Sequence, residues 1–163
     1  MIRSMGSTDK GPVLSLLKST AMFTSEELAV AEEIIDIYLD RPGQGDYDIV
    51  VIENPGCVLS GYLVYGPTSL TEGTFDVYWM AVAPAEQGKG YGKSLVGWVE
   101  NKIRELSGRM IIIETSSQPK YDPTRRFYLR LGYHEVARIP DFYKKGDDRV
   151  IYAKYLEQSA ANA

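Results

Sequence analysis

The sequence predicts an α/β protein of the α+β kind, with a mixed, mostly antiparallel central sheet of six to seven strands and helices on both faces. Three observations predict this class. Apolar residues recur at helical period between Leu28 and Leu39. Two β-rich runs, 47–53 and 57–65, follow so close together that an antiparallel hairpin must connect them. From Thr74 onward, strand and helix patterns alternate, which is typical of a parallel strand–helix–strand unit.

In the first half, a short helical stretch is predicted over 13–18. The main helix should begin at the capping-box spacing Thr24-Ser25-Glu26-Glu27 and end at Arg41-Pro42-Gly43. Asn54-Pro55-Gly56 predicts the hairpin turn. A third strand, rich in aromatic and β-branched residues, is predicted over 74–82.

In the second half, helical spacing predicts a helix over 92–106. The run Met110-Ile-Ile-Ile-Glu-Thr115 is almost wholly apolar, so we expect a strand covered on both faces. Asp122 should cap a helix that has Pro123 in its first position and stops at Gly132. Two last strands, 133–139 and 149–156, should flank a polar and aromatic loop over 140–148.

The chain of 163 residues suits one domain, which we expect over 13–156, with a flexible segment at 1–12 and a flexible tail at 157–163. Its 18 Lys and Arg against 22 Asp and Glu argue against a nucleic-acid partner. With Cys57 alone, no intrachain disulfide can form, which favours a reducing compartment. Neither a secretory leader nor a membrane span is evident, so a cytoplasmic protein is expected.

The segment Gln87-Gly88-Lys89-Gly90-Tyr91-Gly92-Lys93-Ser94 predicts a phosphate-binding turn. It lies between a predicted strand and a predicted helix. Alternating glycines let successive amide groups converge on an anion, and the start of the helix adds the positive end of its dipole. Lys89 and Lys93 add positive charge nearby. A tight strand-to-helix turn without a ligand is the structural alternative.

Three kinds of phosphate ligand can be compared. The dinucleotide pattern G-x-G-x-x-G fails because Lys93 stands where its last glycine belongs. The Walker A pattern of nucleotide hydrolases finds its end in Gly92-Lys93-Ser94, but Gln87 replaces its first glycine. The pattern Q/R-x-x-G-x-G/A is matched by Gln87 to Gly92 in full.

That last pattern resembles the coenzyme A motif of the GNAT N-acetyltransferase superfamily. Phe127-Tyr128-Leu129-Arg130-Leu131-Gly132-Tyr133, about forty residues downstream, resembles a second segment of this family. The resemblance covers about 13–156. It implies an acetyl-CoA-dependent N-acetyltransferase that needs no metal and has a sheet splayed between strands ending near Val82 and Thr115. It also implies that the backbone of Met80, Ala81 and Val82 contacts the cofactor.

The resemblance assigns two catalytic candidates. Tyr128 would be the general acid that protonates the leaving thiolate, and its alternative is a core aromatic. Glu114 is the candidate general base, because burial at the end of an apolar strand would raise its pKa. A structural carboxylate is its alternative. Asp76, Tyr78 or water are other candidates for the base.

Further details of the resemblance concern the partners. Tyr121 stands where many members have a cofactor-contacting Asn, so Arg125 or Arg126 is considered for the phosphates instead. Cys57 and His134 are expected to play no part in the chemistry. The acceptor, an amine-bearing small molecule or peptide, should bind near 140–148 and 22–24. A homodimer through an edge strand and a non-catalytic acyl-CoA-binding module both remain open.

Overall fold

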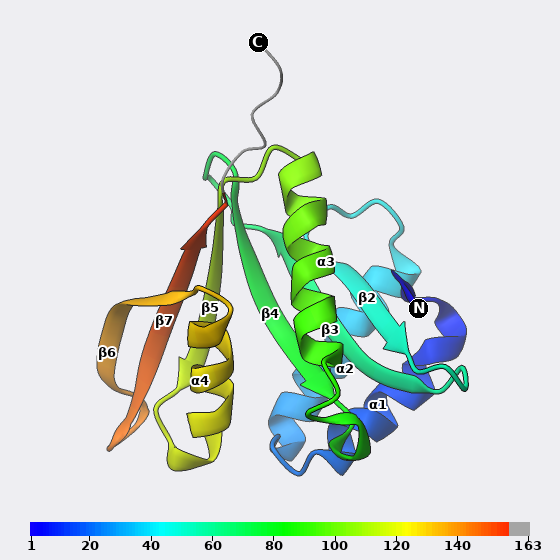
Figure 1. The fold of residues 1–163 in the computed structure, drawn as a ribbon, viewed down its shortest axis with the longest axis horizontal. Coiled ribbons are helices and arrows are strands. Elements are labelled where there is room, and N and C mark those ends of the chain that lie inside the picture. The colour runs from blue at the N-terminus through cyan, green and yellow to red at the C-terminus, as the bar shows by residue number, and fades with distance from the viewer. Residues whose placement is uncertain (157–163) are drawn as a thin grey trace.

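The computed structural model describes residues 1–156 and is drawn in Figure 1. The helical elements are η1 (Ser7–Asp9), α1 (Lys10–Ser19), α2 (Ser25–Asp40), η2 (Pro84–Glu86), α3 (Tyr91–Glu105), η3 (Pro119–Tyr121) and α4 (Asp122–Arg130). The strands are β1 (Ile2–Ser4), β2 (Asp48–Glu53), β3 (Leu59–Pro67), β4 (Thr74–Val82), β5 (Met110–Ser116), β6 (His134–Lys144) and β7 (Asp147–Tyr155).

The seven strands of residues 1–156 form one sheet in the order β1-β2-β3-β4-β5-β7-β6. Only β4 and β5 are parallel, and every other neighbouring pair is antiparallel. The mixed, mostly antiparallel sheet and the parallel strand–helix–strand unit are therefore confirmed.

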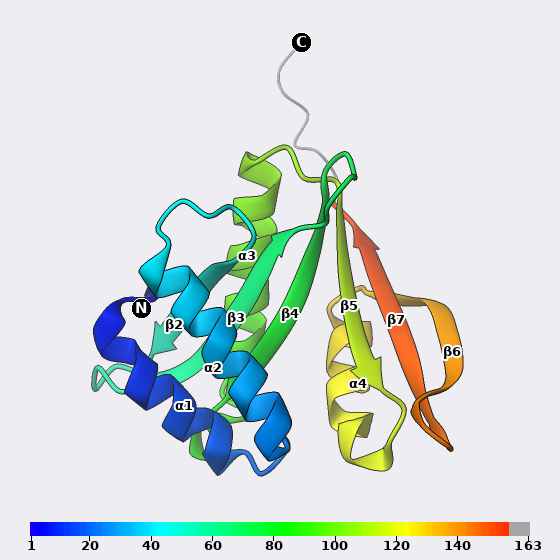
Figure 2. The same cartoon turned by 180° about the vertical axis from the view of Figure 1, so that it is seen from behind.

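Helices cover both faces of this sheet, as expected. α3 and α4 pack on one face, where a core cluster joins side chains of β2 to β5 and β7 with Tyr128 and Tyr133. α1 and α2 pack on the other face, over β2, β3 and the end of β4. Figure 2 shows that α1 and α2 stop short of β5, β7 and β6, whose face on that side carries no helix. The second core therefore lies in only one half of the molecule.

The expectation of a flexible segment at 1–12 is wrong. β1 pairs with β2, and Met5 is buried. The Arg3 guanidinium binds Asp9 at 2.6 Å and Glu53 at 2.5 Å. The polar composition of this segment, which argued for flexibility, supplies the ion pairs that hold it. The predicted flexible tail, 157–163, lies outside the described residues.

Two further expectations are corrected on the far side of the sheet. The predicted loop 140–148 is mostly strand, because β6 runs to Lys144 and the hairpin turns at Gly146, whose φ is +80°. β5 is not covered on both faces: Ile111 and Ile113 are buried, whereas Glu114 is exposed. The apolar run of β5 therefore has one buried face and one partly exposed face.

The local signals at helix starts are mostly confirmed. The Thr24 hydroxyl caps α2 by accepting the Glu27 N–H, and the Glu27 carboxylate accepts a hydrogen bond from the Thr24 N–H at 2.7 Å. α4 begins at Asp122 itself, with Tyr121 in the capping position. Cys57 lies in the hairpin turn with a φ of +58°, so β3 begins two residues later than expected.

Candidate active site

The central strands separate halfway along their length. β4 and β5 pair only between Thr74–Val77 and Met110–Ile113, although both strands continue beyond these residues. Tyr78 is a β-bulge, because Trp79 pairs with Val64 and Val77 with Tyr65. A bulge bends its strand and increases the local twist, which turns β4 away from β5. Figures 1 and 2 both show the resulting V-shaped gap, which agrees with the predicted splay.

Beyond the bulge, β4 presents an unpaired edge. Met80, Ala81 and Val82 pair with β3 on one side and, within residues 1–156, have no strand partner on the other. The Gln87 side chain donates a hydrogen bond to the Val82 carbonyl at 3.2 Å, which ties the end of the strand to the following turn. An extended ligand with amide groups can add to such an edge.

The predicted phosphate turn begins directly after this edge. Gly88 has a φ of +76° and Gly90 a φ of +90°, and a Cβ at either position would meet nothing within 4 Å. The first hydrogen bond of α3 runs from the Ser94 N–H to the Gly90 carbonyl at 3.0 Å. Within residues 1–156, the N–H groups of 88–93 donate to no protein acceptor. Free N–H groups at a helix start form an anion site.

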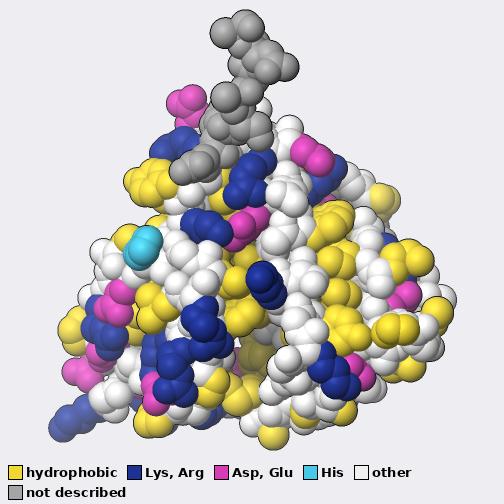
Figure 3. Space-filling view, in the orientation of Figure 1, with side chains coloured by type: hydrophobic (Ala, Val, Ile, Leu, Met, Phe, Trp, Pro, Cys, Tyr) yellow, Lys and Arg dark blue, Asp and Glu magenta, His cyan; other side chains and the backbone are white. Residues whose placement is uncertain are grey.

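The charges around the turn fit an anion. Lys89 pairs with Glu86 at 3.1 Å, whereas Lys93 forms no ion pair within residues 1–156. Gly92 lies against the Phe127 ring, which a Cβ would approach to 3.3 Å, so this glycine lets α3 and α4 come together. Figure 3 shows a hollow between α4 and α3, with hydrophobic side chains at its bottom and Lys and Arg side chains around it.

Tyr128 lies on α4 beside the gap. Its side chain is 5% exposed, and its ring packs against Phe127, Tyr133 and Tyr152. Burial raises the pKa of Tyr128 above its ordinary value. The phenol is thus a proton donor at neutral pH, and no hydrogen bond holds its hydroxyl within residues 1–156. The ring belongs to the core. The structure therefore agrees both with a core aromatic and with a general acid at this position.

Glu114 differs from expectation. It is the first residue of β5 beyond the paired segment, at the vertex of the gap. Its side chain is 35% exposed and forms an ion pair with Arg149. The expectation that Glu114 is buried is wrong, because this residue is exposed, on the opposite face of β5 from the buried Ile111 and Ile113.

The remaining candidates, Asp76, Tyr78 and Arg125, differ in their surroundings. Asp76 accepts a hydrogen bond from the Thr68 hydroxyl at 2.6 Å. The pKa of Tyr78 is raised to about 12 by burial and by nearby Asp76, Tyr47 and Asp46. Arg125 donates to the carbonyls of Ser116 at 2.5 Å and Gln118 at 3.2 Å and pairs with Asp122, so it is held in the protein and not free for a phosphate.

A group of side chains that the sequence did not single out lies around the gap, on the side of the sheet where α1 and α2 pack. We call Glu27, Trp79, Glu114, Tyr121, Tyr143 and Arg149 the aromatic–charged cluster. Phe23 packs on Trp79 with 5.1 Å between ring centroids, and the Arg149 guanidinium lies 4.8 Å from the centre of the Phe142 ring. The Lys120 ammonium donates to the Met22 carbonyl at 3.0 Å, which joins the two sides of the gap. From the sequence, Glu27 was interpreted only as part of a helix cap, so its place in this cluster was not predicted.

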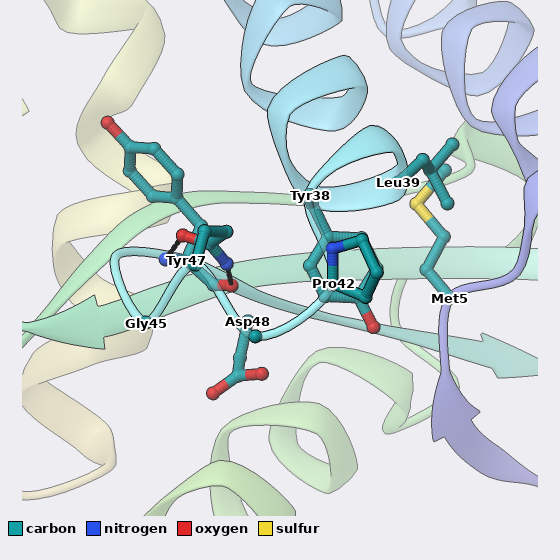
Figure 4. Close-up of a pocket in the computed structure, with 9 residues that line it drawn as sticks. Met5, Tyr38, Leu39, Pro42, Gly45, Tyr47 and Asp48 are labelled. Carbon is teal, nitrogen blue, oxygen red and sulfur yellow. Dashed lines mark hydrogen bonds between the residues drawn. The ribbon is translucent and has the colours of Figure 1, made fainter.

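A separate hollow lies at the other end of α2. Figure 4 shows Tyr38, Pro42 and Asp48 around it, with Met5 and Leu39 to one side. The Tyr47 ring points away from this hollow. No candidate site residue lines it, so it is not part of the active site.

Comparisons with known proteins agree with this geometry. A family model described as an acetyltransferase (GNAT) domain matches residues 45–135. A solved structure described as an acetyltransferase of the GNAT family from Desulfovibrio desulfuricans is 40% identical, covers 96% of this chain and 98% of its own, and superposes with a TM-score of 0.90. No curated protein matches the sequence.

More distant structures share the fold alone. The ribosomal-protein-S18-alanine N-acetyltransferase of Escherichia coli is 16% identical over 100% of this chain and 97% of its own, with a TM-score of 0.76. A protein described as an acetyltransferase from Salmonella typhimurium, solved with acetyl-CoA, is 20% identical over 100% and 97%, with a TM-score of 0.70. Because the family model matches more than half of the chain and the Desulfovibrio relative spans nearly all of it, this protein belongs to the GNAT acetyltransferase family.

Proposed function

We propose that this protein transfers an acetyl group from acetyl-CoA to a primary amine of a small molecule or peptide, by direct attack while both substrates are bound. One observation carries the proposal: the free N–H groups of 88–93 lie at the end of the unpaired edge of β4. A ligand with an anionic end and an extended, amide-containing arm fits both features. The diphosphate and pantetheine arm of acetyl-CoA have this chemistry.

The two glycines of the turn support the fit. Gly88 and Gly90 leave open space where any side chain would stand, so phosphate oxygens can approach the backbone. Lys93 adds a cation that has no protein partner within residues 1–156. The Salmonella structure named above holds acetyl-CoA on the same fold.

Tyr128 is our candidate for the general acid. Its phenol stays protonated at neutral pH and lies on α4 beside the gap. A thiol has a pKa of about 8.5, so a leaving thiolate needs only a weak acid. A backbone N–H on the edge of β4 is our candidate for polarising the acetyl carbonyl.

Glu114 is our candidate for accepting the amine proton, through water. It stands at the vertex of the gap and is open to solvent, and its ion pair with Arg149 fixes its position. Asp76 is the alternative, because it lies on the neighbouring strand within the paired segment.

The cytoplasm is our proposed location. The single cysteine, Cys57, is free and exposed, which suits a reducing compartment. Within residues 1–156, no helix is both long and apolar enough to cross a membrane.

Ligand linkage tests the first step. Acetyl-CoA at millimolar concentration should raise the melting temperature, whereas ATP with Mg²⁺ should not. A panel of amines and peptides, assayed for release of free coenzyme A thiol, tests the second step. Stabilisation by ATP with Mg²⁺ and none by acetyl-CoA would contradict the proposal and favour a nucleotide hydrolase.

A further inference from the structure

We propose that the acceptor is a primary ammonium on an aromatic or apolar body with no carboxylate beside the amine, and that Glu27 binds this ammonium. The inference rests on the proposed acetyl transfer and names its acceptor class. It follows from the aromatic–charged cluster, which lies on the side of the splayed strands opposite α3 and α4.

The cluster is assembled from segments far apart in the sequence. Figure 2 shows the start of α2 beside the gap between β4 and β5. The Lys120–Met22 hydrogen bond of 3.0 Å brings η3 to the α1–α2 junction. Trp79 comes from β4 beyond the bulge, and Tyr143 comes from the β6–β7 hairpin. An acceptor that reaches the vertex of the gap from this face therefore passes aromatic rings on both sides.

Glu27 supplies the negative charge for a cation here. One carboxylate oxygen accepts the Thr24 N–H, and the other has no partner within residues 1–156. The side chain is half-buried, so its charge is less screened than that of a fully exposed glutamate.

The tyrosines of the cluster lie near several carboxylates. Burial and then the charge of Glu27 raise the pKa of Tyr121. Burial and then Glu114 raise the pKa of Tyr143, with Asp147 and Glu27 adding to the effect and Arg149 opposing it. Three carboxylates, Glu27, Glu114 and Asp147, act on these phenols against one cation, Arg149, which favours an ammonium, and aromatic faces attract the same group.

Within residues 1–156, protein partners hold the two cations of this region. Arg149 is paired with Glu114 and stacked on Phe142, and its remaining Nε has no hydrogen-bond partner but is buried. The Lys120 ammonium is bound to the Met22 carbonyl and lies 5.1 Å from the centre of the Tyr121 ring. A carboxylate beside the amine would meet Glu27 without a compensating partner, so free amino acids should be poor acceptors.

Three acceptors that share one aromatic ring test the acceptor class. Phenethylamine and phenylalaninamide carry the amine without a carboxylate, whereas phenylalanine carries both. We expect kcat/KM for each of the first two to exceed that for phenylalanine by about tenfold or more. Equal values, or a preference for phenylalanine, would overturn the inference.

Glu27→Gln tests the residue. Glutamine also completes a capping box, so α2 should keep its cap while the negative charge is lost. We expect KM for phenethylamine to rise about tenfold with little change in kcat. The matched control is Glu26→Gln, which removes a charge from the exposed neighbouring position of the same helical turn. Equal KM values in the two variants would overturn the role of Glu27.

Failure of the proposed acetyl transfer and failure of the proposed acceptor class give different experimental results. If acetyl-CoA neither stabilises the protein nor supports turnover of any amine, the proposed function is wrong and this inference falls with it. If acetyl-CoA binds and free amino acids are the better acceptors, only the acceptor class and the role of Glu27 are wrong.

Discussion

At the scale of single residues, the Tyr128 hydroxyl is one oxygen on a ring that otherwise belongs to the core. Tyr128→Phe keeps the ring and its contacts with Tyr133 and Tyr152. We expect kcat to fall about 100-fold, since general acid catalysis contributes on this order. The melting temperature should hardly change, because the hydroxyl has no hydrogen-bond partner within residues 1–156. Steady-state kinetics and thermal melts measure the two effects.

Tyr152→Phe is the matched control for this prediction. Tyr152 is 2% exposed and belongs to the same aromatic group, yet it has no proposed part in the chemistry. It should keep kcat within about threefold of the unaltered enzyme. Equal losses in the two variants would mean that Tyr128 acts through packing alone.

A second prediction at this scale concerns the Glu114 carboxylate. If Glu114 accepts the amine proton, Glu114→Gln should lower kcat/KM by about 10- to 100-fold near pH 7. The deficit should shrink as pH rises, because the acceptor then loses its proton without help. A pH profile of both enzymes measures this. Asp76→Asn is the comparison, and a pH-dependent loss in that variant instead would transfer the role to Asp76.

Residue roles could be predicted from the sequence only where chemistry and local pattern coincide. The Thr24–Glu27 cap follows from local spacing and is confirmed. The burial of Glu114 was predicted wrongly, because an apolar run does not reveal how far the helices of the other half extend. The bulge at Tyr78 carried no local signal, since no glycine or proline marks it. Tyr128 as the acid stays a prediction.

At the scale of elements, the turn before α3 should bind anions through its backbone. Gly90→Ala places a Cβ on a residue with a φ of +90°, which an alanine adopts only at a cost of about 1–2 kcal/mol. The backbone should then rotate and turn its N–H groups away from a shared anion. We expect the acetyl-CoA Kd, measured by calorimetric titration, to rise about tenfold or more.

Gly43→Ala is the matched control for the turn. Gly43 also has a positive φ, +81°, and also leaves open space at the Cβ position, but it lies beyond the end of α2. Both variants should lose similar stability, and only Gly90→Ala should lose affinity. Unchanged affinity in both variants would show that the turn does not hold the cofactor.

Element boundaries show which signals are local. β4 was predicted with its observed bounds, and α3 begins one residue before the expected start. Both strands of the β6–β7 hairpin were predicted, but 140–148 was predicted as a loop between them because of its polar and aromatic side chains. β6 is indeed exposed along its length, but its pairing with β7 makes it a strand. A strand that is exposed on both faces lacks the alternation on which the prediction depends.

At the scale of the whole molecule, the sheet has two halves, β1 to β4 and β5, β7 and β6. The core on one face of the sheet is what mainly joins them. The core under α3 and α4 includes β4 and β5 side chains and so spans both halves, whereas the core under α1 and α2 stays in one half. This asymmetry leaves one face of β5, β7 and β6 without helices, next to the splay. The proposed cofactor edge and the proposed acceptor cluster therefore meet from opposite faces at the same gap.

Asp147 fixes the β6–β7 hairpin to the end of β5 and should govern how the molecule responds to acid. Its carboxylate is 2% exposed and accepts hydrogen bonds from Ser116 and Gln118, each at 2.5 Å. Burial alone would raise the pKa of Asp147, but these bonds and the Ser117 N–H together hold it below its ordinary value. A lowered pKa in the folded state stabilises the fold above about pH 4, and this stability is lost as pH falls through the folded value.

Asp147→Asn should therefore lower the melting temperature at pH 7 by about 5 °C, because the amide cannot accept both bonds as the carboxylate does. The decline of melting temperature below about pH 4 should be shallower in this variant. It should not vanish, because Arg3 lowers the pKa of Asp9 by its hydrogen bonds and adds the same dependence at the other edge of the sheet. Thermal melts between pH 7 and pH 3 measure both effects. Parallel curves for the two proteins would mean that the hairpin is held by its strand pairing with β5, without a contribution from the charge of Asp147.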